Sequence, residues 1–325
     1  MTEERALIAE TCDRLFAEQL DENVFAAAET GTFPQDLWDA ITENGLDRIL
    51  VPEDWGGSGL GWEDAHVVLV AAGRHAVPAP LAEAIAAGWL LARAGTELPD
   101  GVVSLGTPMV GGGVEVPWGR RAAHAVVPGT DGVRCVSLEG VGITHDRNIG
   151  RDPRDSVAGL DVPAMADDPV RAAGALARAC QMAGAAAAAL DLCVDYANAR
   201  VQFGRPIGRF QAIQQQLAVM ASEVAAAGVA ARDACRTVDA GGDIHLAAAS
   251  AKIRAGEAAG KAANIAHQVH GAIGFTEECH LHHLTRRLWA WRSEFGAEGD
   301  WAGWLGARVI ARGADNLWPD LMGRP

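Results

Sequence analysis

The sequence predicts an α+β protein that is mostly helical, because three consecutive regions of the chain differ in composition and in the spacing of their apolar residues. Amphipathic stretches occupy residues 1–98, short glycine- and valine-rich runs occupy residues 99–166, and long alanine-rich segments fill residues 167–325. We expect an N-terminal helical domain, a small antiparallel β-domain and a C-terminal four-helix bundle with these boundaries. With 325 residues the chain is long enough to bury a large core.

The N-terminal region predicts four helices. Apolar residues at helical spacing mark the first two, and Gly45 ends the second, because glycine favours the left-handed cap position. A short extended piece, Ile49-Leu50-Val51, should follow. The other two helices are expected at about Trp62–Arg74 and Leu81–Gly95.

The middle region predicts short strands. Ala125-Val126-Val127 and Val133–Leu138 flank the turn residues Gly129-Thr130-Asp131-Gly132, a pattern typical of a β-hairpin. The remaining region predicts the bundle, because alanine at such density favours helices and lets them pack closely. Its helices are expected near Val170–Ala199, Phe210–Ala240, Ile244–His270 and Leu281–Phe295.

A break between the first two bundle helices carries polar side chains. Gly204 and Gly208 bracket Pro206, so Arg200, Gln202 and Gln211 should lie near one bend. A guanidinium can grip a phosphate through several donors, and side-chain amides can bond further oxygens. The residues alone leave a second interpretation open, an ordinary helical elbow with a solvated arginine.

Composition narrows the class of protein. The formal charge of −15 argues against a nucleic-acid backbone as partner, so a polyanionic ligand would need local arginines. The start of the chain is charged and helix-like rather than a secretory signal, and no apolar run is long enough for a membrane span. The six scattered cysteines contain no CxxC pair, which indicates reduced thiols in a cytoplasmic protein rather than a disulfide framework or a zinc site.

Two blocks of sequence resemble the acyl-CoA dehydrogenase family. Arg200–Gln214, read as R-x-Q-F-G-x-P-I-x-x-F-Q-A-I-Q, is similar to a signature of that family, and Gln268–Glu278 with Leu284–Arg287 resembles a second block. The stretch Gly45–Gly59 is similar to a turn of the family's first domain. The resemblance implies a flavoenzyme that removes hydrogen from the α- and β-carbons of an acyl-CoA thioester, with FAD as cofactor and an electron-accepting flavoprotein as partner.

The resemblance also assigns residues to the cofactor. It implies that Arg200, Gln202, Phe203 and Gln211 hold one FAD. It further implies that Gln268, Gly271 and Gly274 meet the adenine end of a neighbouring subunit's FAD. Gly271 has the alternative interpretation of a plain helix cap, and the family's usual double glycine is here Gly271-Ala272.

The catalytic base departs from the family pattern. Most members carry a glutamate directly before a glycine after the arginine pair, and that position here is Phe295. The family's alternative position, on the helix before the elbow, is Gly174. Glu294 lies one residue early, which on a helix rotates a side chain by about 100°. This rotation makes Glu294 a poor substitute for the family's glutamate. It is nevertheless the candidate base, and the alternative interpretation is an ion-paired or solvated surface glutamate.

Two further features of the sequence bear on function, one in the middle domain and one near the end of the bundle. The middle domain lacks a run like the family's T-x-P-x-x-G-S-D between Val103 and Pro117, and Gly111-Gly112-Gly113 occupies roughly its place. A histidine-rich stretch, His267–His283, has no accompanying Cys or Asp pattern, so we expect no metal site there.

The hypotheses that follow are three. A short middle domain, a retained FAD elbow and a missing glutamate together resemble the smaller subunit of bacterial heteromeric dehydrogenases of the steroid side-chain type, in which a longer homologous partner supplies the base. The second hypothesis is a homomeric flavoenzyme that uses Glu294, or another acid not recognised from the sequence, on an acyl thioester. The third is a redox-inactive homologue that serves as a scaffold or in non-redox biosynthesis.

Overall fold

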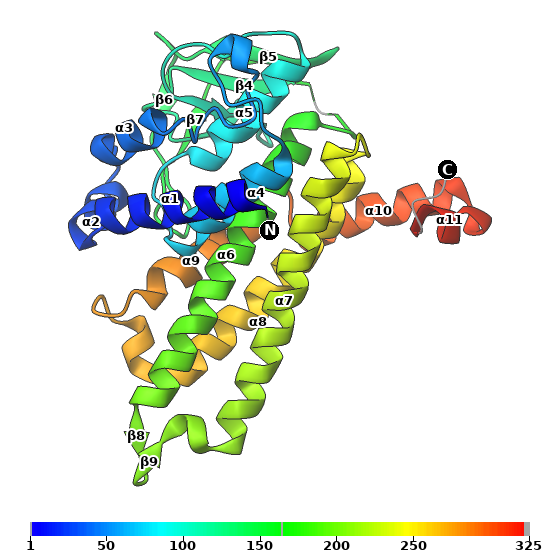
Figure 1. Ribbon diagram of the computed structural model, residues 1–325. Coiled ribbons are helices and arrows are strands. Elements are labelled where there is room, and N and C mark those ends of the chain that lie inside the picture. The colour runs from blue at the N-terminus through cyan, green and yellow to red at the C-terminus, as the bar shows by residue number, and fades with distance from the viewer. Residues whose placement is uncertain (1, 164, 322–325) are drawn as a thin grey trace.

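A computed structural model describes residues 2–163 and 165–321 and shows a β-rich region above a bundle of long helices (Figure 1). The α-helices are α1 (Glu3–Gln19), α2 (Glu22–Glu29), α3 (Gln35–Glu43), α4 (Trp62–Arg74), α5 (Leu81–Arg93), α6 (Pro169–Ala199), α7 (Gln211–Asp239), α8 (Ile244–His270), α9 (Leu281–Ser293), α10 (Glu298–Arg312) and α11 (Leu317–Leu321). The 3-10 helices are η1 (Glu53–Trp55), η2 (Ile207–Arg209), η3 (Gly271–Phe275) and η4 (Ala314–Asn316). The strands are β1 (Val103–Leu105), β2 (Thr107–Pro108), β3 (Val114–Pro117), β4 (His124–Gly129), β5 (Gly132–Ser137), β6 (Ile143–Thr144), β7 (Arg154–Val157), β8 (Val201–Gln202) and β9 (Arg205–Pro206).

The mostly helical α+β fold is confirmed, and the predicted helices lie where the periodicity placed them. Helices α4 and α8 have the predicted bounds, and α5, α6, α7 and α9 differ by one or two residues at an end. The domain boundaries near residues 98 and 166 stay predictions. The change from helix to strand falls between α5 and β1, and the change back falls between β7 and α6.

The N-terminal region differs from the prediction at two places. Helix α2 was not expected, and Asp21 caps its N-terminus with a carboxylate that accepts a hydrogen bond from the Val24 amide at 2.8 Å. The prediction of an extended piece at Ile49–Val51 was wrong. These buried residues form turns, because the amides of Gly59 and Leu60 in the glycine-rich segment that follows donate to the carbonyls of Val51 and Ile49.

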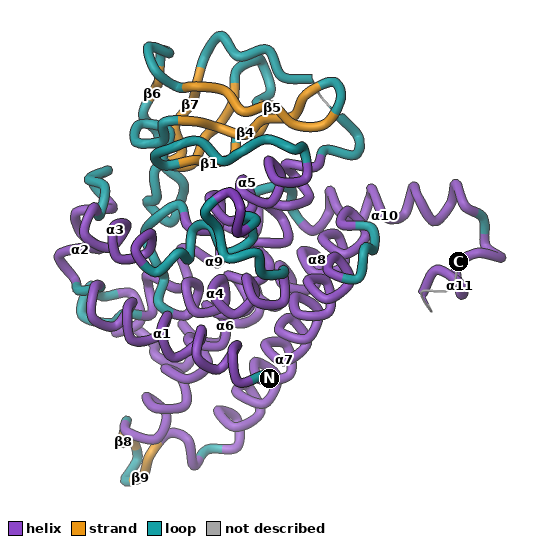
Figure 2. The backbone as a smooth tube through the Cα atoms, turned by 45° about the horizontal axis from the view of Figure 1, so that its top comes forward, coloured by secondary structure: helices purple, strands orange, loops and turns teal. Residues whose placement is uncertain are grey.

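The β-region consists of two small sheets (Figure 2), one ordered β1-β4-β5 and the other β2-β3-β7-β6. The predicted hairpin is β4 and β5, closed by the pair Gly129 and Gly132. One pairing is not antiparallel: β1 runs parallel to β4. The intervening residues 106–123 are long enough to return the chain to the starting edge, which is what a parallel pairing requires.

Helices α6, α7, α8 and α9 form the bundle, and α4 packs across α6. The α4–α6 crossing is unusually close, since a Cβ on Gly73 or on Gly184 would overlap a backbone carbonyl of the facing helix. Glycine at both positions therefore sets the distance between the N-terminal helices and the bundle. Helices α10 and α11 project away from the body, with Ile310 81% exposed (Figure 1).

A single apolar core runs through the helical and β-regions, and buried ion pairs cross it. Arg178 of α6 pairs with Glu83 of α5, and Arg287 of α9 pairs with Asp152 at 2.8 Å. These pairs connect elements from all three predicted domains.

Candidate functional site

The elbow between α6 and α7 is a small hairpin at the lower tip of the bundle (Figure 1). Strands β8 and β9 pair through Gln202 and Arg205, and the two turn residues Phe203 and Gly204 have φ values of +51° and +79°. Positive φ at both central positions is the geometry of a two-residue hairpin turn with the twist of its strands. The predicted simple bend is thus a hairpin, which holds the Phe203 ring 92% exposed.

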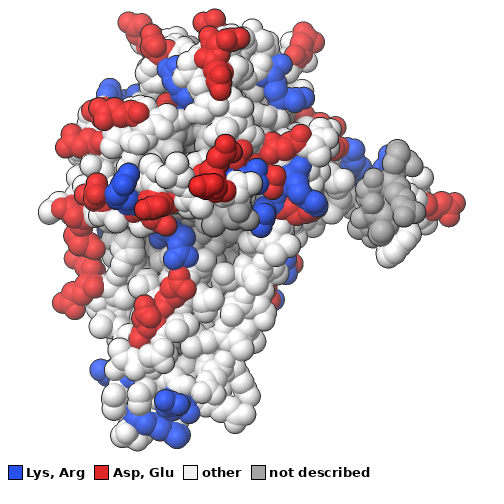
Figure 3. Space-filling view, viewed as in Figure 1, with Lys and Arg blue, Asp and Glu red and all other residues white. Residues whose placement is uncertain are grey.

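The predicted cofactor residues of the elbow all face outward. Arg200, Gln202 and Gln211 are exposed together with Phe203. The Arg205 guanidinium, also exposed, lies over the Phe210 ring with its central carbon 4.3 Å from the ring centroid. Figure 3 shows Lys and Arg side chains gathered at this tip, whereas most Asp and Glu side chains on that face lie over the upper part of the molecule. A local positive surface therefore exists in a chain of net charge −15.

The second predicted cofactor segment follows the C-terminus of α8. Gly271 has φ +63° and ψ −142°, and its amide donates to the His267 carbonyl, so it does cap the helix. A Cβ at Gly271 would meet open space, whereas Gly274 is buried and packs against His270. Gln268 is exposed on the last turn of α8. The cap geometry and an approach of a ligand to the Gly271 backbone are compatible, because the outer side of this glycine is open.

The elbow and this segment lie at the same end of the bundle. The Tyr196 ring, one turn before Arg200, stacks on the His270 ring with centroids 4.6 Å apart. The Cys193 sulfur lies 3.8 Å from the Nδ1 of the same histidine. These contacts hold the end of α6 beside the end of α8, so residues 70 positions apart in sequence are presented on one end of the molecule.

The residues present fit a dinucleotide cofactor. The end carries a guanidinium and amide groups that can donate to phosphate oxygens, an exposed aromatic ring, and an open glycine backbone that allows close approach. All of these groups are exposed, which fits a cofactor that a second chain covers.

The two positions at which the family resemblance expects a base contact each other. Gly174 on α6 lies directly under the ring of Phe295, and a Cβ on Gly174 would overlap that ring. Phe295 is buried, and its carbonyl accepts a hydrogen bond from the Trp301 indole at 3.0 Å. A glycine and a packed aromatic ring therefore occupy the region where a base would be expected, and neither carries a carboxylate.

Glu294 turns away from Phe295 into a buried cluster of charges. Its carboxylate accepts hydrogen bonds from Arg154 at 2.8 and 3.0 Å, from Arg178 at 2.7 Å and from Asn148 at 2.7 Å. The side chain is 8% exposed. Its backbone has φ −66° and ψ 138°, so it ends α9 rather than continuing it.

The protonation of Glu294 follows from this setting. Burial by itself raises the pKa, but the charges of Arg154 and Arg178, with their hydrogen bonds, outweigh it and hold the pKa of Glu294 well below its usual range. An efficient general base has a pKa near the working pH. Glu294 as catalytic base stays a prediction, and these surroundings favour the ion-paired interpretation.

Lys252 secures the turn that carries these residues. Its side-chain nitrogen (Nζ), on α8, donates to the carbonyls of Arg292 and Gly296 at 2.7 Å each. Burial lowers the pKa of Lys252 to about 7. Neither Lys252 nor Arg154 was singled out from the sequence, since only the tertiary structure brings them to residues 292–296.

The glycine-rich loop of the β-region offers no polar side chains. Gly111, Gly112 and Gly113 join β2 to β3, and all three have positive φ. They are the residues that roughly replace the family's flavin-contacting run, and their backbone forms only the turn of a short hairpin. This geometry leaves the pocket for a flavin ring without side-chain donors from that loop.

The histidine-rich stretch divides into two environments. His267 stacks on Phe275 and bonds the Thr285 hydroxyl at 2.9 Å, whereas His283 stacks on Phe25 of α2. Burial lowers the pKa of His280 to about 4, so this histidine is neutral at physiological pH. The structure brings Glu22 beside His280 and His283, a grouping that sequence spacing alone does not reveal.

Comparison with known proteins identifies the family. Residues 2–98 match the acyl-CoA dehydrogenase N-terminal domain, and residues 172–298 match the acyl-CoA dehydrogenase C-terminal domain. The chain is 31% identical to the acyl-CoA dehydrogenase IpdE2 of Mycobacterium tuberculosis, over 88% of this chain and 91% of that protein. The chain belongs to the acyl-CoA dehydrogenase family. As a member it is an oxidoreductase of the acyl-CoA dehydrogenase type.

Solved acyl-CoA dehydrogenases have the same fold. A structure described as the Tcur3481-Tcur3483 steroid ACAD G363A variant is similar with a TM-score of 0.83 and 26% identity, over 96% of this chain and 99% of that one. The ChsE4-ChsE5 complex from Mycobacterium tuberculosis gives a TM-score of 0.83 at 21% identity, over 95% and 98%. The FAD complex of PigA has the same fold, with a TM-score of 0.75 at 19% identity, over 96% of this chain and 99% of that one. FAD is the cofactor of the acyl-CoA dehydrogenase family, to which this chain belongs. Among the residues that the structure describes, no helix is long and apolar enough to span a membrane.

Proposed function

We propose that this chain is an FAD-binding subunit of a heteromeric acyl-CoA dehydrogenase, in which a longer homologous partner supplies the catalytic glutamate. The observation that carries the proposal is the contact between Gly174 and Phe295. Both positions expected to hold a base lack a carboxylate, and the packed ring leaves no room for one at residue 174.

The chain's own residues would then bind and orient the cofactor. Arg200 would donate to phosphate oxygens, Gln202 and Gln211 would bond further polar atoms, and the segment around Gly271 would approach the adenine end. Bound FAD would supply the redox chemistry, as acceptor of a hydride from the β-carbon of the acyl thioester. The exposure of all these groups supports a cofactor held between two subunits.

The descriptions of similar solved structures support a substrate class. Two similar solved structures are two-component assemblies by their descriptions, and one of them is described as a steroid ACAD. We therefore propose a bulky acyl-CoA thioester as substrate, an electron-accepting flavoprotein as the oxidant, and a cytoplasmic location.

The visible spectrum of the purified chain tests this proposal. We would record it for the chain alone and for the chain co-expressed with the longer acyl-CoA dehydrogenase encoded nearest to its gene. We expect flavin absorbance only in the co-purified complex, and bleaching of that absorbance by a bulky acyl-CoA but not by butyryl-CoA.

Two outcomes contradict the proposal in different ways. A lone chain that is yellow and bleaches with an acyl-CoA is a homomeric enzyme, and Glu294→Gln would then test the base directly. A chain that stays colourless both alone and in every co-expression is a redox-inactive homologue.

A further inference from the structure

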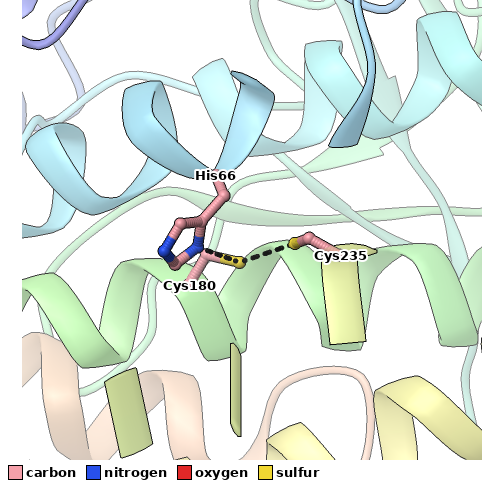
Figure 4. A group of neighbouring side chains, drawn as sticks. All are labelled: His66, Cys180 and Cys235. Atoms are coloured by element: carbon pink, nitrogen blue, oxygen red, sulfur yellow. Dashed lines mark hydrogen bonds between the residues drawn. The ribbon is translucent and has the colours of Figure 1, made fainter. Parts of the chain in front are cut away.

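Three side chains with metal-binding atoms meet where α4, α6 and α7 cross (Figure 4). The Nδ1 of His66 lies 3.4 Å from the sulfur of Cys180, and that sulfur lies 3.6 Å from the sulfur of Cys235. All three ligand atoms lie within 4.8 Å of one another. The residues come from three helices and are separated by more than fifty positions in sequence, so no spacing motif announces the group.

Rigid packing holds these three residues in place. The close α4–α6 crossing at Gly73 and Gly184 brings His66 against Cys180. Asp239, one turn after Cys235 on α7, accepts hydrogen bonds at 2.8 Å from the amides of Trp62 and Glu63 and so fastens the start of α4 to α7. The ligand atoms are thus presented by helices whose relative positions are fixed by other contacts.

The distances fit a tetrahedral zinc site. Zn–S bonds of about 2.3 Å and Zn–N bonds of about 2.0–2.1 Å place two sulfurs about 3.8 Å apart, and a sulfur and a nitrogen about 3.6 Å apart. Two of the three observed separations are close to these values, 3.6 Å between the two sulfurs and 3.4 Å between His66 Nδ1 and the Cys180 sulfur, and the third, between His66 and Cys235, is within 4.8 Å. We propose that His66, Cys180 and Cys235 bind one Zn²⁺ ion, with a water molecule as fourth ligand.

Charge and access agree with this assignment. Both cysteines are fully buried, and binding releases their two thiol protons so that two thiolates neutralise the dication where water is largely excluded. His66 is only partly buried, so the ion and the water can reach the group from its side. Soft thiolate ligands select zinc over the oxygen-preferring ions.

The ion would serve as a structural link rather than a catalyst. Cys180 precedes Arg200 by twenty residues, which on a helix places it about 30 Å from the elbow. The three ligands instead join the N-terminal helix α4 to two helices of the bundle. A disulfide between Cys180 and Cys235 is the competing fate of the same sulfurs, and it would leave His66 without a role.

Metal titration of the full chain tests the site. We would purify the chain in a reducing buffer, remove metal with a chelator, and add Co²⁺ as a spectroscopic substitute followed by Zn²⁺. We expect a sulfur-to-cobalt charge-transfer band that saturates at one ion per chain and disappears as Zn²⁺ displaces Co²⁺. Bound Zn²⁺ should also raise the melting temperature, because an ion that binds only the folded state stabilises it.

Variants assign the ligands. Cys180→Ser and Cys235→Ser should each abolish the cobalt band, and His66→Ala should weaken Zn²⁺ binding at least tenfold, whereas Cys12→Ser, at another fully buried cysteine, should leave both unchanged. A folded wild-type chain that shows no charge-transfer band with Co²⁺ overturns the proposal without any variant. A Cys180–Cys235 disulfide in protein isolated without reductant, found as a cross-linked peptide by mass spectrometry, overturns it as well.

Discussion

At the scale of single residues, Glu294 is a buried carboxylate whose ion pairs and hydrogen bonds join separate elements of the fold. Two guanidinium groups and an amide satisfy its carboxylate, and together they connect β7, α6 and the end of α9. Removing one partner of a buried charged cluster leaves the others uncompensated. Glu294→Gln should therefore lower the free energy of unfolding by about 3 kcal/mol at neutral pH.

The pH dependence of that loss has a defined sign. The folded-state pKa of Glu294 lies below the unfolded value of about 4.3, so the ionised carboxylate stabilises the fold above that pH. The stability gap between wild type and Glu294→Gln should thus narrow as the pH falls below about 4.3. Urea unfolding of both proteins across acidic pH measures this, and a gap that widens toward low pH would show that the carboxylate is not held ionised.

Gly174 is the second residue at which a single substitution should change the stability of the fold. A methyl group there overlaps the Phe295 ring, so Gly174→Ala should destabilise the chain by about 1–3 kcal/mol through overpacking. Gly228→Ala is the matched control, because a Cβ on that helical glycine meets nothing within 4 Å and should stabilise α7 by about 0.5–1 kcal/mol. Adding Phe295→Leu should recover part of the loss at residue 174. Equal behaviour of the two glycine variants in thermal unfolding would mean that the ring does not fill this space.

At the scale of elements, the turn between α9 and α10 depends on a side chain from α8. Lys252 donates to two carbonyls of this turn, and Phe295 and Gly296 both have positive φ within it. Lys252→Met should lower the free energy of unfolding by about 2 kcal/mol, because buried carbonyls lose their donor.

The pH dependence of this effect follows from the pKa of Lys252. Since its folded-state pKa is about 7, below its unfolded value, the unfolded chain binds more protons between pH 7 and 10. The gap to Lys252→Met should therefore grow as the pH rises through this range, and chemical denaturation at pH 7 and pH 9.5 checks it. A gap that shrinks instead would place the charged ammonium, not the neutral amine, in the native turn.

At the scale of the whole molecule, the elbow and the Gln268–Gly274 segment share one end of the bundle and both face outward. In the co-expressed complex, Arg200→Ala should weaken FAD binding at least tenfold, because a charge-assisted hydrogen bond contributes about 1.5–3 kcal/mol. Flavin content per complex after dialysis measures the effect. Arg232→Ala, at an exposed arginine of α7, is the control and should retain full flavin. Full flavin retention in Arg200→Ala would remove this residue from the cofactor site.

Much of this organisation was predictable because it is local in sequence. The 3.6-residue periodicity and the alanine content placed the long helices within two residues of their ends, and the Gly129–Gly132 turn placed the β4–β5 hairpin. The prediction of an extended piece at Ile49–Val51 was wrong because a short apolar run forms a strand only when a partner strand pairs with it. Here these residues form buried turns instead. Helix α2 was not predicted because its apolar face is short and packs against a distant part of the chain, where Phe25 stacks on His283 of α9.

The sequence by itself determined the family blocks, the polar composition of the elbow and the absence of glutamate at positions 174 and 295, since these depend only on residue identity and order. Tertiary structure alone decided that Gly174 and Phe295 touch, that Glu294 faces two arginines rather than a pocket, and that His66, Cys180 and Cys235 converge. The physical reason is the same in each case. Such contacts join side chains far apart in the chain, and their distances are set by how whole helices pack, which no local pattern encodes.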